Sequence, residues 1–278
     1  MQIVDAVKHA QQQLVGSDSA RIDTELLLCS VLKCERSHLY TYPEQNLSSA
    51  ELNSFNDLIE QRNIGHPIAH LIQKKEFWSL ELQVTTETLI PRPETEILVE
   101  AALNIIPNES SFSILELGTG TGAISIAIAS DRKLANITAT DIKERALIVA
   151  KVNTEAHQLN NINFQNANWF DINNISTYDL IISNPPYISI GDPHLKQGDI
   201  RFEPESALIS GEEGLDDLYI IIAGAKNYLN KNGWLLLEHG YQQGKTVRQL
   251  LKENNFSTIS TIKDYSNLDR VSIGQWLT

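Results

Sequence analysis

The fold of this chain is decided by the stretch Glu116-Leu117-Gly118-Thr119-Gly120-Thr121-Gly122. An apolar run at residues 114–117 leads into it, and an apolar segment with helical spacing, residues 123–130, follows it. Glycines between a strand and a helix let a ligand approach the backbone closely, and the free N–H groups at the helix start can bind an anion. The stretch therefore predicts a ligand-binding turn at the end of a strand.

A carboxylate lies where such a turn needs one. Asp141 follows the next apolar run, residues 137–140, and comes 19 residues after Gly122. A carboxylate at the end of the second strand can accept hydrogen bonds from both hydroxyls of a ribose. The alternative is a glycine turn with a helix-capping aspartate and no ligand, and the position of Asp141 makes this the weaker interpretation.

From Ser113 onward, short apolar runs alternate with segments of helical periodicity, which is typical of a parallel sheet covered on both faces. The apolar runs predict seven strands, at residues 114–117, 137–140, 162–165, 180–183, 234–238, 257–262 and 271–276. The intervening segments predict helices near residues 123–130, 144–157, 215–229 and 242–253. This part of the chain is therefore expected to have an α/β fold.

The first quarter of the chain predicts a separate helical bundle. Apolar residues recur at helical spacing in three segments, and Ser48 with Glu51 fits a capping box that opens the third. The stretch Gly65-His66-Pro67 ends this pattern, and residues 76–85 alternate polar and apolar as a half-exposed hairpin does. We therefore expect a helical bundle over residues 1–75, a hairpin connector over 76–88 and a sheet domain over 89–278.

A second polar turn, Asn184-Pro185-Pro186-Tyr187, follows the apolar run at residues 180–183. Two successive prolines fix φ and remove two N–H donors, so the turn presents its carbonyl groups outward as rigid acceptors. Asn184 adds a side-chain carbonyl, and Tyr187 offers a flat face that can stack on a planar group. In an open α/β sheet, this turn would share a cleft with the glycine turn. The alternative is a rigid loop without chemistry, which the upstream glycine turn disfavours.

The composition limits the partners and the compartment. The chain has 278 residues with 22 Lys+Arg and 35 Asp+Glu, so its formal net charge is −13. No basic stripe that would bind nucleic-acid phosphates is present, which favours a protein or small-molecule substrate. No apolar run approaches the about 20 residues of a bilayer helix, and residues 1–10 lack the pattern of a secretory signal. Cys29 and Cys34 fit free thiols in a reducing cytoplasm.

Together these residues resemble a known family. The glycine turn, Asp141 and the alternating strands resemble class I methyltransferases, which have a Rossmann-like, seven-stranded mixed sheet and use S-adenosylmethionine. The Asn-Pro-Pro-Tyr turn is similar to that of members that methylate planar amide or amino nitrogens. Further fragments, over nearly the whole chain, are similar to release-factor glutamine methyltransferases of the HemK type. They are Leu89-Ile90-Pro91-Arg92-Pro93-Glu94-Thr95-Glu96, Phe202-Glu203-Pro204, Ala207-Leu208, Gly214-Leu215, Leu236-Leu237-Glu238, Gly240, Lys263-Asp264-Tyr265 and Arg270.

The resemblance implies which residues bind cofactor and substrate. In the family, the backbone of Gly118, Thr119, Gly120, Thr121 and Gly122 contacts the methionine part of S-adenosylmethionine, Asp141 holds the ribose and Trp169 lies near the adenine. Trp169 fits a packing role equally well. Asn184 is placed with both cofactor and substrate; Pro185, Pro186 and Tyr187 are substrate contacts, and Asn184, Pro185 and Tyr187 are the catalytic candidates. The product would be S-adenosylhomocysteine, and the chemistry demands no metal.

The implied reaction is methylation of N5 of the glutamine in the Gly-Gly-Gln motif of class-one peptide chain release factors. Alternatives with the same turn are a ribosomal-protein glutamine or N6 of adenine, although the acidity of the chain argues against free DNA. A non-catalytic module that binds cofactor and partner is an alternative of another class, and the intact tetrad argues against it. We expect a monomeric cytoplasmic enzyme whose bundle docks the protein substrate, without nucleic-acid or membrane binding.

For several other polar residues, the sequence favours a structural role over a role in the reaction. Arg92, Glu94 and Glu96 open a predicted helix. Their charges fit complementarity with the helix dipole, which is favoured over the alternative that they line the cleft. Residues 188–213 lack clear periodicity, which favours a functional or disordered loop. One hypothesis is that this loop covers the bound glutamine, while Glu203 only solvates it. The pair Glu238-His239 favours polarity at a sheet edge over a metal site. One departure from the family is His70-Leu71-Ile72-Gln73-Lys74, where a Tyr-Leu-x-Gly-like run is expected.

Overall fold

The structure is a computed structural model that describes residues 1–14, 16–173 and 176–277. The chain divides into two compact units: a helical unit of residues 1–74 and 196–202, and a sheet unit of residues 75–195 and 203–278. This division differs from the expected one in two places. All of the hairpin except Lys74 belongs to the sheet unit, and a short piece of chain beyond Tyr187 belongs to the helical unit.

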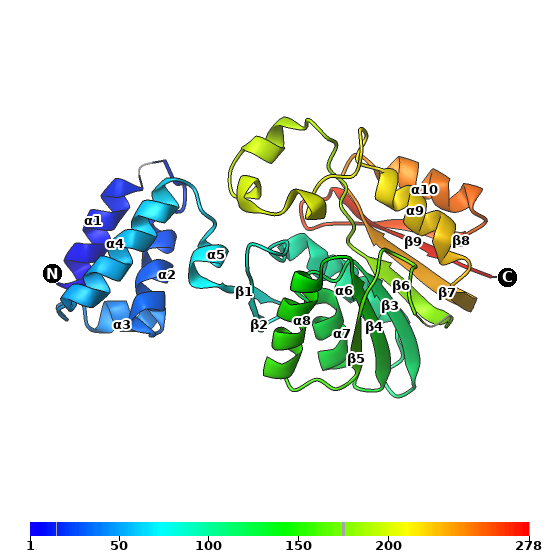
Figure 1. Ribbon diagram of the computed structural model, residues 1–278, viewed down its shortest axis with the longest axis horizontal. Helices are drawn as coiled ribbons and strands as arrows, with labels where there is room; N and C mark the ends of the chain where they lie inside the picture. The colour runs from blue at the N-terminus through cyan, green and yellow to red at the C-terminus, as the bar shows by residue number, and fades with distance from the viewer. Residues whose placement is uncertain (15, 174–175, 278) are drawn as a thin grey trace. The chain divides into compact units, whose positions relative to one another are not determined.

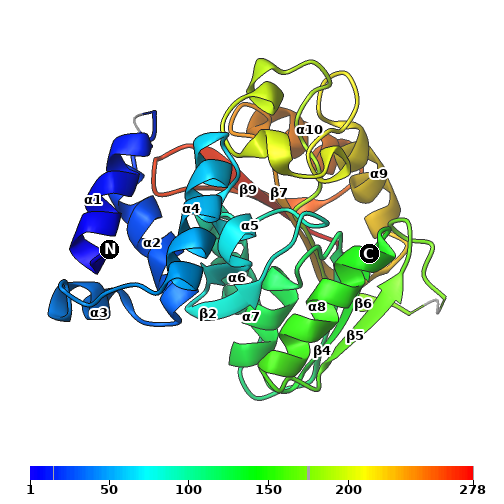
Figure 2. The same cartoon turned by 60° about the vertical axis from the view of Figure 1, so that its left-hand side comes forward.

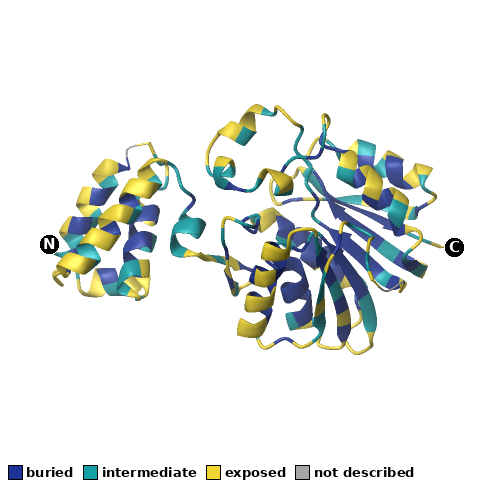
Figure 3. Cartoon of the chain, viewed as in Figure 1, coloured by how far each residue is buried: buried dark blue, intermediate teal, exposed yellow. Residues whose placement is uncertain are grey.

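The helical unit contains the three helices that the periodicity predicts. Two further helices of six and five residues, α3 and α5, are too short to leave a periodic pattern. The capping box that Ser48 and Glu51 predict is present at the start of α4. The unit has its own apolar core, in which Leu27, Leu28 and Phe55 are almost fully buried. Figure 3 shows buried positions of these helices in dark blue. Its α-helices are α1 (Ile3–Gln13), α2 (Ala20–Leu32), α3 (Arg36–Thr41), α4 (Ser49–Asn63) and α5 (Ile68–Ile72).

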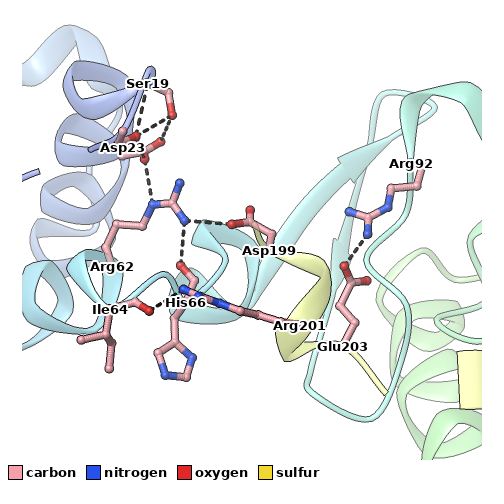
Figure 4. Close-up of polar contacts among 10 residues, drawn as sticks. Ser19, Asp23, Arg62, Ile64, His66, Arg92, Asp199, Arg201 and Glu203 are labelled. Atoms are coloured by element: carbon pink, nitrogen blue, oxygen red, sulfur yellow. Dashed lines mark hydrogen bonds and ion pairs between the residues drawn. The ribbon is translucent and has the colours of Figure 1, made fainter. Parts of the chain in front are cut away.

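Residues 196–202, here called the inserted segment, are held in the helical unit by polar contacts. Arg62 of α4 donates from Nε to Asp23 Oδ2 at 2.8 Å and from Nη1 to Asp199 Oδ1 at 3.0 Å (Figure 4). Arg201 donates to the carbonyl oxygen of Ile64 at 2.7 Å. The loop that follows the second turn therefore includes a piece of the helical unit.

A two-stranded hairpin of β1 (Lys74–Phe77) and β2 (Leu80–Gln83) confirms the predicted alternation. Trp78 and Ser79 have φ of 54° and 56°, the left-handed values that a tight hairpin turn requires. Gln73, at φ 56°, ends α5. This is the position of the family departure, so here a glutamine adopts the backbone conformation that a glycine takes without strain.

The sheet unit is built on a seven-stranded mixed sheet with the order β5-β4-β3-β6-β7-β9-β8. Only β9 pairs antiparallel with its neighbours β7 and β8; the other pairs are parallel. The strand order reverses between β3 and β6, and Leu117 pairs with Ser183, so both predicted turns leave the sheet side by side. The strands are β3 (Phe112–Leu117), β4 (Ala135–Asp141), β5 (Ile162–Asn166), β6 (Tyr178–Ser183), β7 (Leu229–Glu238), β8 (Ser257–Lys263) and β9 (Asp269–Gln275).

Helices cover both faces of this sheet (Figures 1 and 2). Apolar residues of α6 and α7 share one core with residues such as Ile114 and Leu180, whereas α9 and α10 share a second core with Leu115 and Ile181. The alternation follows from the two-residue period of the strands. The helices are α6 (Glu96–Ile105), α7 (Ala123–Asp131), α8 (Glu144–Ala156), α9 (Asp216–Ala225) and α10 (Gly244–Glu253), with 3-10 turns η1 (Pro93–Thr95), η2 (Pro193–Lys196), η3 (Ile200–Phe202) and η4 (Glu205–Ala207).

The seven predicted strands are confirmed, but one helix prediction is wrong at its end. The helix expected to reach residue 229 ends at Ala225, and Leu229 instead begins β7 opposite Tyr178. Leu229 is buried, and an apolar residue satisfies a buried strand as well as a helix face, so periodicity alone misplaces the boundary. Cys29 and Cys34 are free thiols, as expected. In the described part of the chain, no helix has the length and apolarity to cross a membrane.

Candidate active site

A cavity of about 400 Å³ opens in the sheet unit at the carboxyl ends of β3, β4 and β6. Most of the residues that the sequence singles out line it. Gly118, Thr119, Gly120, Thr121, Asp141, Asn184 and Pro186 come from these strand ends, and Trp169 follows the end of β5. The cavity is also lined by residues that precede the sheet, including Thr88, Arg92 and Thr95. Segments far apart in the sequence therefore converge on one site at the switch point of the sheet.

The glycine turn requires glycines for two physical reasons. Gly118, Gly120 and Gly122 have φ of 73°, 54° and 83°, in the left-handed region that other residues avoid. A Cβ on Gly122 would also lie 3.0 Å from Ile126 Cδ1 and 3.2 Å from Ala150 Cβ. The turn thus packs closely against its own helix while its backbone lines the cavity.

Glu116, the last residue but one of β3, supports the glycine turn from behind. Its Oε2 accepts hydrogen bonds from the hydroxyls of Thr119, at 2.8 Å, and Ser125. Burial raises the pKa of Glu116 to about 7, although these two hydroxyls oppose the rise. All three residues belong to the same short stretch of sequence, so this support is local.

Asp141 connects the glycine turn to the end of β4. Its two carboxylate oxygens accept hydrogen bonds from the backbone N–H of Gly120, at 2.9 Å, and of Lys143, at 2.8 Å. Burial raises the pKa of Asp141, and the two backbone N–H groups oppose that rise. Each oxygen keeps a further lone pair, so Asp141 can hold the turn and still accept from a ligand hydroxyl.

Asn153 of α8 was not anticipated from the sequence, and it ties the hairpin to the glycine turn. Its Nδ2 donates to the carbonyl oxygens of Gln83, at 3.0 Å, and Thr121, at 2.9 Å, while its Oδ1 accepts from the Gln83 N–H at 2.7 Å. The side chain is 1% exposed. A buried asparagine on the apolar face of a predicted helix is the only sequence signal that could have indicated this role.

The second turn presents Asn184 to the cavity. The Asn184 Nδ2 donates to Thr95 Oγ1 at 3.1 Å. Pro185 is buried and Pro186 lines the cavity. The Tyr187 hydroxyl donates to Glu238 Oε1 at 3.3 Å, and burial raises the pKa of Tyr187. The tyrosine hydroxyl is therefore directed to the end of β7.

Gln243, at the start of α10, holds the backbone of this turn. Its Nε2 donates to the carbonyl oxygens of Tyr187 and Gly214, both at 3.0 Å, and its Oε1 accepts from the Gly240 N–H at 2.8 Å. All the hydrogen-bonding atoms of the carboxamide are thus used in fixing main chain. Nothing near the tetrad in the sequence indicates this support.

Trp169 packs against the core under α9 and α10 and also lines the cavity, so its predicted place near the adenine stays a prediction. A Cβ on Gly118 would lie 3.5 Å from Trp169 Cζ3, so a side chain there would fill the space beside the ring. The absence of a side chain on Gly118 keeps this face of the cavity open.

Arg92 and Glu203 have more specific roles than the sequence suggested. Arg92 lines the cavity and forms an ion pair with Glu203 (Figure 4). The other carboxylate oxygen of Glu203 accepts from the Ile90 N–H at 2.9 Å. Glu203 is 6% exposed, so the expectation that it only solvates the loop is wrong. It anchors the loop to the segment before the sheet, and residues that follow it, Pro204 and Ser206, line the cavity. Glu96 accepts from the Trp78 N–H at 2.8 Å.

The interpretation of Glu238-His239 as polarity at a sheet edge is also wrong. Both residues are almost fully buried, because β7 is an inner strand between β6 and β9. His239 donates from Nδ1 to the Gly240 carbonyl, and its Nε2 lies 2.8 Å from Ser272 Oγ; burial lowers the pKa of His239. Burial raises the pKa of Glu238 to about 7, although Thr95, Arg270 and Tyr187 oppose the rise.

Known families match both parts of the chain. The family described as the PrmC N-terminal domain matches residues 5–72, and that described as a methyltransferase domain matches residues 108–272. A solved methyltransferase from Pyrococcus furiosus is 18% identical with a TM-score of 0.55, covering 80% of this chain and 98% of its own. That similarity shows the fold.

Curated relatives are similar over nearly their full length. A release factor glutamine methyltransferase of Aliivibrio fischeri is 46% identical over 266 residues, which is 95% of this chain and 93% of the relative. One from Xylella fastidiosa strain Temecula1 is 48% identical over 255 residues, 92% of this chain and 93% of the relative. With both domains matched and identities this high, the chain belongs to the release factor glutamine methyltransferase family.

Proposed function

We propose that this protein transfers a methyl group from S-adenosylmethionine to the side-chain amide nitrogen of the glutamine in the Gly-Gly-Gln motif of class-one release factors. The family supports the reaction. The observation that carries the residue assignment is the convergence of the glycine turn and Asn184 on one cavity. The first turn is suited to a cofactor with a ribose, and the second to a planar carboxamide.

The residues of the cavity fit S-adenosylmethionine. The Thr88 hydroxyl is buried in the lining without a hydrogen-bond partner among the described residues, as expected of a group that awaits a ligand. We assign Gly118 to Gly122 to the methionine part, Asp141 to the ribose and Trp169 to the adenine. When bound, the cofactor supplies an electrophilic methyl group on a sulfonium. We expect the same residues to bind its demethylated product, S-adenosylhomocysteine. We expect the reaction to need no metal.

The protein's task is to orient a poor nucleophile. An amide nitrogen is weakly nucleophilic because its lone pair is delocalised into the carbonyl group. If Asn184 Oδ1 and the Pro185 carbonyl oxygen each accept one hydrogen of the substrate NH₂, they fix its direction and stabilise positive charge that develops on the nitrogen. Pro186 contributes to the wall of the cavity. We assign the face of Tyr187, the next residue of the turn, to packing against the substrate carboxamide.

We assign the helical unit to docking of the release factor. It has its own apolar core, and with the inserted segment it includes chain that belongs to the loop after the second turn. Hence we propose that loop residues such as Ser206 and Ile209, which line the cavity, cover the bound glutamine. The net charge of −13 argues against direct binding of nucleic acid, and we infer a monomer that acts in the cytoplasm.

Mass spectrometry of a purified class-one release factor after incubation with the enzyme and S-adenosylmethionine tests this function. The expected result is a gain of one methyl on the Gly-Gly-Gln glutamine and none on a release factor that carries glutamate there. Parallel reactions with ribosomal proteins and with an adenine-containing oligonucleotide test the alternatives. A methyl group on either of these, with none on the release factor, would overturn the substrate assignment.

A further inference from the structure

The orientation of the Asn184 carboxamide has to be decided by something other than Asn184. A carboxamide has an acceptor end and a donor end of nearly equal shape, so both orientations fit the same space. The proposed reaction needs the acceptor, Oδ1, toward the substrate NH₂. The reverse orientation would bring two NH₂ groups together. In the structure, Nδ2 is committed to Thr95 Oγ1 at 3.1 Å, which leaves Oδ1 for another partner.

A threonine hydroxyl alone would not select this orientation, because it can donate as well as accept. The selection depends on where the hydroxyl proton points. Thr95 is 4% exposed, and its hydroxyl lies close enough to the carboxyl group of Glu238, which is 1% exposed, to lower the pKa of that carboxyl. An ionised carboxylate accepts only, so it draws the Thr95 proton and leaves Oγ1 to accept from Asn184.

Glu238 has an acceptor to spare for this purpose. Its Oε1 accepts from the Tyr187 hydroxyl at 3.3 Å, and its Oε2 is buried without a hydrogen-bond partner that meets normal geometry among the described residues. The positive charge of Arg270, on β9, favours the ionised form, whereas Glu94 and burial oppose it. Glu238 thus contacts Tyr187 of the second turn, lies beside Thr95 of the 3-10 turn that precedes α6, and is outside the cavity lining that the substrate would meet.

Thr95 is itself held rigidly. It ends the 3-10 turn Pro93–Thr95 and leads directly into α6, whose residues Ile97 and Leu98 are buried in the core. Two prolines, Pro91 and Pro93, limit the backbone before it. The side chain therefore meets Asn184 from a fixed element rather than from a mobile loop.

We propose that Thr95 is a positioning residue of the methyl transfer, and that its hydroxyl, oriented by Glu238, holds the Asn184 carboxamide with Oδ1 toward the substrate amide. This inference rests on the proposed role of Asn184. The inference separates Thr95 from a residue that only packs. If Thr95 acts by orienting Asn184, its substitution should slow the reaction only while Asn184 is present.

A double-mutant cycle of Thr95→Val with Asn184→Ala tests this dependence. Valine keeps the shape of threonine and removes the hydroxyl. We expect Thr95→Val to lower kcat about tenfold, with KM for S-adenosylmethionine within about twofold of the wild type, and Thr95→Ser to restore most of the rate. In the Asn184→Ala background, Thr95→Val should change kcat by less than about twofold, because the carboxamide that it orients is gone.

The controls separate this role from a general loss of stability. Thr154→Val removes another buried hydroxyl, one bonded to the Ala150 carbonyl in α8, and should leave kcat unchanged. If Thr95→Val does not fold, Thr95→Ala serves the same test. The kcat of Thr95→Ser should again be closer to the wild-type value than that of Thr95→Ala. Wild-type kcat in Thr95→Val, or an equal loss in both backgrounds, would overturn the inference while leaving the proposed function intact. Wild-type kcat in Asn184→Ala would overturn the role of Asn184 and the inference with it.

Discussion

The two turns of the active site leave neighbouring parallel strands, β3 and β6, yet they are supported in different ways. Each has a buried glutamate behind it, Glu116 and Glu238, and burial raises the pKa of both to about 7. Glu116 binds Thr119 and Ser125, three and nine residues away in the sequence. Glu238 binds Tyr187 from 51 residues away.

The other supports sharpen this difference. The second turn is also held by Thr95, 89 residues before Asn184, and by Gln243, 56 residues after Tyr187. The supports of the glycine turn from outside its own stretch are nearer in the sequence: Asp141 lies 21 residues after Gly120, and Asn153 lies 32 residues after Thr121. The glycine turn is thus held largely by residues of its own stretch of sequence, whereas the second turn acquires its geometry from the surrounding fold.

The largest effect is expected at the tip of the second turn. Asn184→Ala removes the carboxamide that we propose as acceptor of a substrate hydrogen, so kcat should fall roughly 10²–10³-fold, as on deletion of one preorganised group that stabilises transition-state charge. Steady-state kinetics at saturating release factor and cofactor measure this. Asn104→Ala, an exposed asparagine of α6, is the matched control. Equal turnover by wild type and Asn184→Ala would remove Asn184 from the mechanism.

The glycine turn should respond differently, through folding and cofactor binding. Gly122→Ala places a Cβ against Ile126 and Ala150 at a φ of 83°, so the free energy of unfolding should fall by about 2–4 kcal/mol. Urea denaturation measures this loss, and calorimetry of S-adenosylmethionine binding should show weaker affinity. Gly16→Ala, at a position without close neighbours, is the control. Unchanged stability and affinity in Gly122→Ala would contradict the close packing of the turn.

Gln243→Ala tests whether the second turn depends on distant residues. It removes hydrogen bonds to the Tyr187 and Gly214 carbonyls and to the Gly240 N–H, so the free energy of unfolding should fall by about 1–3 kcal/mol. The variant should also lose kcat while keeping its affinity for S-adenosylmethionine. Gln249→Ala, an exposed residue of the same helix, should change neither quantity. Loss of cofactor affinity rather than kcat would show that the two turns are not separately supported.

The smallest effect is expected from the two buried glutamates, Glu116 and Glu238, on the pH dependence of the free energy of unfolding. Their pKa values lie near 7 in the folded protein against 4.5 for a free glutamate, so the folded state binds more protons between these values and stability falls as pH rises through them. Glu238→Gln should remove part of this pH-dependent loss of stability. The groups that influence the Glu238 carboxyl are Thr95, Tyr187, Arg270 and Glu94. Denaturation at pH 5 and pH 8 measures the difference.

The two glutamates should differ in which kinetic constant they make dependent on pH. If Glu238 orients Thr95, wild-type kcat should rise from pH 6 to pH 8 as Glu238 ionises, and Glu238→Gln should flatten this rise. Glu116→Gln, in the environment of Ser125, Thr119 and Asp141, should instead alter the pH dependence of the KM for S-adenosylmethionine. An unchanged kcat profile in Glu238→Gln would assign the rise to another group.

Prediction from the sequence succeeded where the signal was local. The glycine turn, Asp141 and the strand before Asn184 are each indicated by residues within a few positions, because backbone conformation and strand burial are local properties. The helix end near Leu229 was misplaced because an apolar residue satisfies either structure. Glu203 and Glu238 were misjudged because nothing in a sequence states whether a carboxylate is buried, and burial here follows from the strand order and from Arg92.

The sequence by itself determined the seven-stranded architecture and the positions of the two turns at the ends of neighbouring strands. Only the tertiary structure decided that Thr95 binds Asn184 and that Glu238 and Gln243 bind Tyr187. It also decided that residues 196–202 belong to the helical unit. The physical reason is range. A turn's backbone geometry depends on the residues within it, but the orientation of a flat carboxamide depends on partners that folding brings together from distant parts of the chain.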